Sequence, residues 1–240
     1  MFATNFEVSE ALTPPLGESA RFSRLLRLVP SFQLLNPQSV NRGQAEIFIG
    51  EKFQEVYGAE LHDFLPQLLT MQCAGKLSGV AGISPARGRA LFLEQYLDKP
   101  VEQELAALTG KSVRREEIVE IGNLVAANNG ASLALFIVLA SLLQDAGFTT
   151  LVFTLTEQLR NKFHRLGFEP LFIADAEESE LAPGTGSRWG SYYQQRPQVM
   201  AGNLQKAVSL IDRGQLYTCI RMALDGQIRD LGDQFSNHGK

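Results

Sequence analysis

Cysteine and histidine are scarce in this sequence of 240 residues. It holds two cysteines, Cys73 and Cys219, and three widely spaced histidines, His62, His164 and His238. Two cysteines cannot build a disulfide framework, and neither a Cys-x-x-Cys pair nor a histidine cluster offers the ligands of a metal site. We therefore expect no bound metal ion. Apolar residues make up 45% of the chain, which is the usual share for a globular protein with a hydrophobic core.

Long apolar runs and dense basic segments are also missing. The longest apolar stretch, residues 133–143, is interrupted by Ser141 and falls short of the ~18 residues that span a bilayer. The N-terminus lacks the basic start and the apolar centre of a secretory signal. A formal net charge of −4, without a run of Lys and Arg, argues against a dedicated nucleic-acid-binding protein. We predict a cytoplasmic protein with no nucleic-acid partner.

The chain divides into an arm, a main domain and a helical tail. Residues 1–36 form the arm, which ends in a mixed basic and apolar segment, residues 21–35. At a helical period this segment favours peripheral contact with a membrane, and the alternative is a packing arm with a first strand over residues 25–29. Residues 37–202 form the main domain. Residues 203–240 form a C-terminal helical extension that covers a sheet edge or makes a homodimer.

The first half of the main domain reads as a helix, a hairpin and a second helix. Ser39 caps the first helix and Gly58 ends it. Two apolar runs, residues 64–74 and 77–84, flank a glycine-containing turn that is typical of a hairpin. A helix over residues 101–108 follows and ends at a glycine.

Strands alternate with helices in the second half. The predicted order is strand, turn, helix, strand, helix and strand, over residues 118–126, 127–132, 133–147, 149–156, 157–166 and 168–174. The first of these strands carries Glu120, a carboxylate in an apolar run that is otherwise suited to burial. Such a carboxylate either pairs with a nearby cation, Arg114 or Arg115, or serves as a general base whose pKa is raised by burial.

The turn that follows this strand is a candidate anion site. Its backbone N–H groups lie at the start of a helix, where these donors and the helix dipole favour a phosphate. The residues concerned are Asn128, Asn129, Gly130, Ala131 and Ser132. The alternative is a strand-turn-helix unit in which the glycine serves packing alone, because the turn lacks the spacing of a Walker A loop or a dinucleotide fingerprint. Arg160, on the next predicted helix, is a further candidate contact for a donor phosphate.

This order of elements, with Leu-Gly-Phe-Glu-Pro at residues 166–170, resembles the acyl-donor half of the GNAT superfamily of acyltransferases. The usual loop there is Gln/Arg-x-x-Gly-x-Gly/Ala, and this chain keeps the central Gly130 but lacks the leading Arg or Gln. The resemblance implies an α/β fold with a GNAT-like twisted mixed, mostly antiparallel sheet and helices on both faces. It also implies that backbone N–H groups near Leu124 and Val125 polarise a thioester carbonyl.

The same resemblance implies acyl-CoA or acyl-phosphopantetheine as a co-substrate, with no tightly bound cofactor. The changed loop leaves an acyl carrier protein open as the donor. The upstream half is similar to the acyl-homoserine-lactone synthases, a GNAT branch whose strand bears Glu-x-Ser-Arg. Here the strand reads Glu120-Ile121-Gly122-Asn123, so the carboxylate is kept and Asn stands in place of Arg. A carboxylate beside the thioester is therefore implied, but lactone formation is not.

Three further residues are candidate substrate contacts. Asn123 hydrogen-bonds the acceptor or the pantetheine amides, with the capping of a bulge as its alternative. Met71, on the hairpin, falls where the lactone synthases shape their substrate pockets, and core packing is the alternative. Trp189 forms a wall of the acyl pocket or belongs to the core.

From the first predicted helix to residue 207 the chain resembles the thermostable hemolysin family, through Trp-Gly-x-Tyr-Tyr-x-x-x-Pro-x-Val-Met-Ala-Gly at residues 189–202. Tyr192 or Tyr193 in this motif is a candidate acid for the departing thiolate. We place both on a strand, where adjacent side chains face opposite ways and one alone enters the site.

Together these features predict an N-acyltransferase that moves an acyl chain from acyl-CoA or acyl-carrier protein to an amino acid or another small amine. Glu120 would deprotonate the amine, which then attacks the thioester directly. The alternative is a membrane-active hemolysin that acts without turnover through its basic N-terminal segment.

Overall fold

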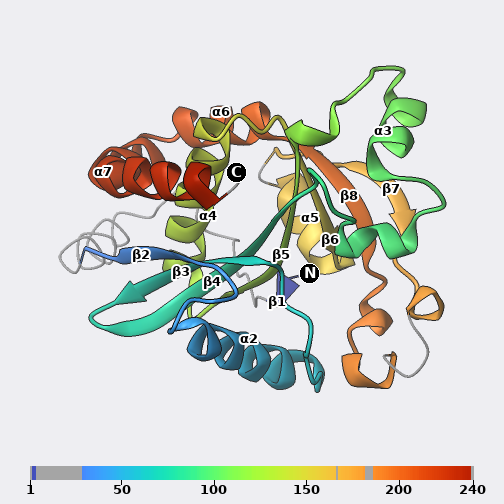
Figure 1. The fold of residues 1–240 in the computed structure, drawn as a ribbon, viewed down its shortest axis with the longest axis horizontal. Coiled ribbons are helices and arrows are strands. Elements are labelled where there is room, and N and C mark those ends of the chain that lie inside the picture. Colours follow the sequence, from blue (N-terminus) through green and yellow to red (C-terminus); the bar gives the residue numbers. More distant parts are fainter. Residues whose placement is uncertain (1, 4–28, 166, 182–185, 239–240) are drawn as a thin grey trace.

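One twisted sheet runs through the protein, seen at the centre of Figure 1. The computed structural model describes residues 2–3, 29–165, 167–181 and 186–238. The strands lie in the order β2-β3-β4-β5-β6-β8-β7, and β1 pairs with β5 beside this path. Their bounds are β1 Phe2–Ala3, β2 Ser31–Leu35, β3 Gln67–Cys73, β4 Lys76–Pro85, β5 Ile118–Ala126, β6 Thr150–Leu155, β7 Leu171–Asp175 and β8 Gln198–Asn203.

The sheet is mixed and mostly antiparallel, as predicted. The pairs β5–β6 and β1–β5 are parallel, and the other described pairs are antiparallel. The predicted hairpin is β3–β4, in which Ala74 and Gly75 form the two-residue turn with φ values of 52° and 73°. Two positive φ angles match the twist of the flanking strands, which explains the glycine at this place.

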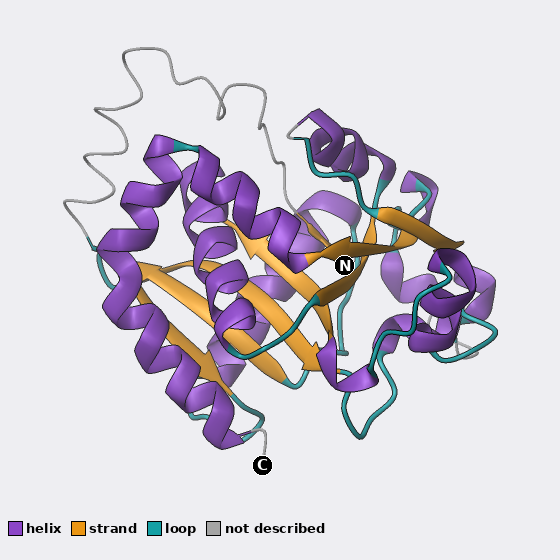
Figure 2. Cartoon of the chain, turned by 90° about the horizontal axis from the view of Figure 1, so that it is seen from above, coloured by secondary structure: helices purple, strands orange, loops and turns teal. Residues whose placement is uncertain are grey.

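Helices cover both faces of the sheet, which confirms the predicted fold class. One face carries α2 (Arg42–Tyr57) and α3 (Val101–Thr109), and the other carries α4 (Asn129–Asp145) and α5 (Glu157–Arg165). The last two helices, α6 (Leu204–Arg213) and α7 (Gln215–His238), pack on α4. Figure 2 shows this layer of helices lying across the strands. Because α4 lies between the sheet and these helices, its side chains are buried almost all round.

The C-terminal helices also hold the sheet at its edge. The Gln227 side chain of α7 donates to the carbonyl of Pro30 at 2.9 Å and accepts from the backbone N–H of Phe32 at 3.1 Å. These bonds tie α7 to the start of the edge strand β2. Within the part of the chain that the structure describes, no helix combines the length and apolar character that crossing a bilayer requires.

Several predicted details differ from the structure. Ser39 does not cap α2; its hydroxyl accepts from the backbone N–H of Asn36 in a turn that precedes the helix, which follows Asn41. Gly58 does end α2, with φ of 66°. The basic segment and the first strand predicted within it fall mainly on residues 4–28, outside the described part. Among the described strands, the one at this edge of the sheet is β2. The strand β8, Gln198–Asn203, was not predicted from the sequence.

A bulge in β5 sets which of its residues face each side of the sheet. Ile121 and Leu124, three positions apart, both belong to the core on the α4 side, so the alternation of the strand slips by one residue. Asn123 has φ of 46° and the pairing with β4 shifts register there. Asn is one of the few residues besides Gly that adopts this conformation readily. The bulge turns Gly122 and Asn123 toward the cavity that Glu120 lines.

β5 and β6 separate partway along their length. Their pairing ends at Ile121 and Phe153. Further along β5, Leu124 and Val125 pair with β1 in parallel register. The edge of β5 that β6 leaves is therefore able to hold another extended segment.

Candidate active site

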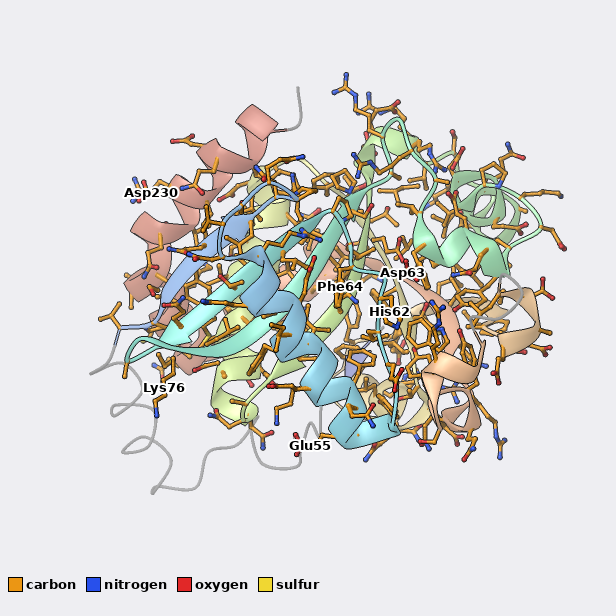
Figure 3. All side chains as sticks on the ribbon, turned by 60° about the horizontal axis from the view of Figure 1, so that its bottom comes forward. Glu55, His62, Asp63, Phe64, Lys76 and Asp230 are labelled. Carbon is orange, nitrogen blue, oxygen red and sulfur yellow. The ribbon has the colours of Figure 1, made fainter. Side chains whose placement is uncertain are left out.

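A cavity of about 830 Å³ lies on the α2 side of the sheet, a size that suits a small-molecule site. Its lining comes from α2, from the connection between α2 and β3, from the segment after β4 and from β5. Figure 3 shows His62, Asp63 and Phe64 on the connection between α2 and β3. Of the predicted site residues, the cavity brings together Glu120, Asn123 and Trp189.

Glu120 is 3% exposed, and its carboxylate is held by two backbone donors. The N–H of Phe92 donates to one carboxylate oxygen at 2.8 Å and the N–H of Leu93 donates to the other at 3.1 Å. Burial raises the pKa of Glu120 to about 7, although these two hydrogen bonds favour the ionised form. A carboxylate with such a pKa can accept a proton from an amine near neutral pH.

Glu120 has no ion pair with Arg114 or Arg115, the alternative that the sequence left open. Arg114 pairs with Glu117 at the surface, and Arg115 pairs with Glu94 and Glu102. These arginines are therefore engaged elsewhere, and the hydrogen bonds to the Glu120 carboxylate come from the backbone N–H groups of Phe92 and Leu93.

Asn123 anchors the connection that closes one side of the cavity. Its side-chain oxygen accepts from the backbone N–H of Leu65 at 2.9 Å, and its side-chain nitrogen donates to the carbonyl of Asp63 at 3.5 Å. From the opposite side, Arg42 of α2 donates to the carbonyls of Leu65 and Pro66, each at 2.9 Å. The Asn123 amide thus ties the bulge in β5 to this connection and shapes the cavity wall.

The aromatic residues of the C-terminal motif form a cluster next to this cavity. Trp189 lies against Phe92, with ring centroids 6.2 Å apart, and against Tyr192 and Tyr193. The Tyr193 hydroxyl hydrogen-bonds that of Tyr96 at 2.7 Å. Burial raises the pKa of Tyr193 to about 12, so it remains a proton donor at neutral pH.

Tyr192 is fully buried, and its hydroxyl finds no hydrogen-bond partner in the described residues. Burial raises its pKa well above the ordinary range of tyrosine. We predicted that the two tyrosines lie on a strand, and this prediction is wrong. Tyr192 precedes a short 3₁₀ turn that begins at Tyr193. The turn places both rings near Trp189, at an interplanar angle of 88° to each other.

The predicted donor contacts lie further along β5 and in the turn beyond it. Leu124 and Val125 are buried at the edge where β1 pairs. Asn128 caps α4, since its side-chain oxygen accepts from the N–H of Ala131 at 3.0 Å, and the N–H of Ser132 bonds the Asn128 carbonyl. Two of the predicted anion donors are therefore used within the start of the helix.

The remaining predicted residues lie outside the cavity wall. Asn129 and Gly130 begin α4, and Arg160 is half-buried on α5. Met71 is fully buried in the core on the α4 side and does not line the cavity.

Sequence reasoning missed the segment that holds Glu120. Phe92 and Leu93 bind Glu120 through backbone N–H groups, which every residue except proline has, so their side chains do not indicate this role. Arg42 and Arg89, two cations that line the cavity, were also missed. One signal was present: Glu94 stands three residues after Leu91 and closes a turn by accepting from its N–H at 2.7 Å.

The fold matches several solved acyl-transferring enzymes. FeeM, an N-acyl amino acid synthase from uncultured soil microbes, is 13% identical, with a TM-score of 0.52 over 79% of this chain and 98% of FeeM. TofI in its apo form is 11% identical, with a TM-score of 0.50 over 76% of this chain and 96% of TofI. The AHL synthase LasI is 13% identical over 73% of this chain and 90% of LasI, but its TM-score of 0.49 is too low to support the fold assignment. At these identities the likeness concerns the fold, which is GNAT-like.

The sequence, rather than the fold, shows the family of this chain. The profile of the thermostable hemolysin family matches residues 35–208, so the chain belongs to this family, as its C-terminal motif indicated. No curated protein gives a significant match.

Proposed function

We propose that this protein is an N-acyltransferase that moves an acyl chain from a thioester to an amine by direct attack. The observation that carries this proposal is Glu120, a buried carboxylate with a pKa of about 7 in the wall of a cavity. Burying such a group lowers the stability of the fold, and groups with pKa values shifted in this way cluster at functional sites. The GNAT-like fold places it on the strand from which the neighbouring strand separates.

The cavity has the chemistry to hold an amino acid as acceptor. Arg89 lines the same cavity as Glu120, so an acceptor with both an ammonium and a carboxylate finds a partner for each charge. Arg42 is already engaged with Glu46 and with the carbonyls of Leu65 and Pro66. Phe92 and Trp189 add aromatic walls. We therefore favour an amino acid over a simple amine.

The open edge of β5 supports an acyl thioester as donor. The pantetheine arm is extended and carries amide groups, which can pair with a strand edge as another strand does. Leu124 and Val125 take such a partner here, in the form of β1. The experiment described below compares acyl-CoA with acyl-carrier protein and so identifies the carrier of the thioester.

The reaction proceeds in one direct transfer. Glu120 accepts a proton from the ammonium, and the amine nitrogen attacks the thioester carbonyl carbon. The C–N bond forms, the C–S bond breaks, and the thiolate takes up a proton from Tyr192 or Tyr193. The second proton of the nitrogen restores the tyrosine hydroxyl, and Glu120 releases the first proton to solvent, so the products are an amide and a free thiol.

A panel of donors and acceptors tests this function. The purified full chain is mixed with acyl-CoA or acyl-carrier protein of short to long acyl chain and with amino acids or simple amines. A thiol reagent follows thiol release, and mass spectrometry identifies the amide. Thiol release that does not depend on any acceptor, or none at all, would contradict the proposal. Dye release from liposomes without any donor would instead support a hemolysin that acts without turnover.

Arg89→Gln separates acceptor recognition from chemistry. We expect the KM for an amino-acid acceptor to rise about tenfold or more, because a charge-assisted hydrogen bond to the carboxylate is lost. The KM for the matching amine without a carboxylate should stay within about twofold of the wild-type value, and so should kcat. Equal effects on both acceptors would show that Arg89 does not read the carboxylate. Arg87→Gln, an exposed residue on the same segment that does not line the cavity, is the matched control.

The double variant Phe2→Pro/Ala3→Pro tests the donor slot. Proline has no backbone N–H, so both donors of β1 are removed and its pairing with β5 weakens. A thioester that binds this edge must displace β1, and we expect its KM to fall by about threefold to tenfold, the worth of one hydrogen bond. The KM of the acceptor serves as the internal control and should not change. An unchanged or higher KM for the donor would show that the thioester binds elsewhere.

A further inference from the structure

The Arg115 guanidinium organises the whole segment between β4 and the strand that bears Glu120. Its Nε donates to the carbonyl of Ala86 at 2.9 Å, and one Nη2 bond reaches the carbonyl of Arg89 at 2.7 Å. The other bonds reach carboxylates, those of Glu94 at 2.7 and 2.8 Å and that of Glu102 at 2.5 Å. All five N–H groups of the guanidinium are therefore used.

Glu94 connects Arg115 to the turn at residues 91–97. In addition to Arg115, its carboxylate accepts from the backbone N–H of Leu91 at 2.7 Å and from that of Val101 at 2.9 Å. Burial alone would raise the pKa of Glu94, but the hydrogen bonds from Arg115 and from these two N–H groups lower it to about 2. Glu94 is therefore ionised at any working pH, and it spans the turn from its first residue to the start of α3.

The N–H groups that hold Glu120 lie inside this clamped turn. Phe92 and Leu93 follow Leu91 directly, and each donates to one oxygen of the Glu120 carboxylate. Two backbone N–H groups can meet two oxygens at once only when the turn keeps its shape. The hydrogen bonds of Arg115 go to Ala86, Arg89, Glu94 and Glu102 and not to Glu120, so it acts on that carboxylate only through the turn.

We propose that Arg115 is a positioning residue for Glu120: through Glu94 and two carbonyls it fixes the turn whose N–H groups orient the carboxylate of the base. This inference rests on the proposed function. It assigns a role in that chemistry to Arg115, a side chain outside the cavity wall that belongs to a half-buried ion-pair cluster.

A charge-conserving substitution isolates this role. Arg115→Lys keeps the positive charge, but a single ammonium cannot reach two carbonyls and two carboxylates with the same geometry. The substitution also leaves the other titratable and charged groups near Glu120 chemically unchanged. They are the N-terminal ammonium, Glu94 and Tyr96 on the turn, and Arg42, Glu46, His62, Asp63 and Arg89 around the cavity. A change in the pKa of Glu120 therefore reports a change in the turn, in its N–H donors and in the Glu94 carboxylate that it carries.

We expect Arg115→Lys to raise the pKa of Glu120 by about one unit, because a hydrogen bond to the ionised form is lost. The acid limb of the kcat/KM profile should move to higher pH by the same amount, and kcat should fall about tenfold or more. Arg114→Lys is the matched control, since Arg114 is the neighbouring arginine and pairs with Glu117 at the surface. It should change neither quantity.

Titration of carbon-13-labelled Glu120 by NMR keeps the test independent of turnover. Arg115→Ala with added guanidinium should recover part of the wild-type profile. A folded Arg115→Lys protein with an unshifted Glu120 pKa would overturn the proposal, even when its activity falls. If that variant does not fold, Glu102→Gln decides by the same criterion, with a smaller shift expected. If the Glu120 pKa shifts but no donor and acceptor react in the wild type, the proposed function fails and the positioning role stands.

Discussion

Glu120→Gln is expected to lower kcat for acyl transfer by about a hundredfold to ten-thousandfold, the usual contribution of a general base. Glutamine has nearly the shape of glutamate and keeps one oxygen for the N–H of Phe92 or Leu93, so the turn around it should persist. It cannot accept a proton from an ammonium. The loss should therefore appear in kcat and kcat/KM, with little change in the KM of the donor.

The pH profile makes this prediction specific to Glu120. In the wild type, kcat/KM should rise with pH through about 7, because burial raises the pKa of this carboxyl to that value and the ionised form is the base. The residual activity of Glu120→Gln should lack that limb. Glu116→Gln, an exposed residue nearby, is the control and should behave as the wild type. Turnover retained within about threefold of wild type would rule out Glu120 as the base.

The strands and helices of the GNAT-like core could be predicted because their signals are local. Residues 118–126 form β5 with the predicted bounds, and the hairpin, α4 and α5 follow the apolar periodicity of the sequence. Glu120 could be recognised because a carboxylate in a central strand conflicts with burial, and the structure does bury it. The burial of Glu120 could therefore be predicted from the apolar residues around it in the sequence.

The surroundings of Glu120 could not be predicted, because they come from contacts distant in sequence. Its donors are backbone N–H groups 27 and 28 residues away, and any residue type could supply them. The partner of Arg115 was equally hidden: the sequence offered Glu120 as one alternative partner of Arg114 or Arg115, but Glu94, 21 residues from Arg115, binds it through two hydrogen bonds. Nothing in residue spacing distinguishes these two carboxylates.

For the C-terminal motif at residues 189–202, the family could be predicted from the sequence but the local structure could not. Its family resemblance could be recognised and is confirmed by the match over residues 35–208. The local structure was wrong: we expected a strand at Tyr192 and Tyr193, but the chain turns there, and β8 begins later at Gln198. Arg196, with φ of 46°, ends this turn in a conformation that its residue type does not reveal.

Glu120→Gln should also make the protein more stable, and this gain should depend on pH. The pKa of Glu120 is raised from its ordinary value of 4.5 to about 7 in the fold. A carboxyl of this kind binds its proton more tightly when folded. Its stabilising protonated form is therefore present below pH 4.5 and is lost as the pH rises through 7. Glutamine does not titrate, so the variant avoids this loss.

Between pH 5 and pH 8, the free energy of unfolding of the variant should gain about 2–3 kcal/mol over that of the wild type. Urea unfolding of both proteins at several pH values measures the difference, and Glu116→Gln again serves as the control. A difference that stays constant across this range would show that Glu120 has an ordinary pKa in the fold. Its role as a base near neutral pH would then fail with it. A gain in stability joined to a loss of turnover is the pattern expected of a residue kept for chemistry at a cost to the fold.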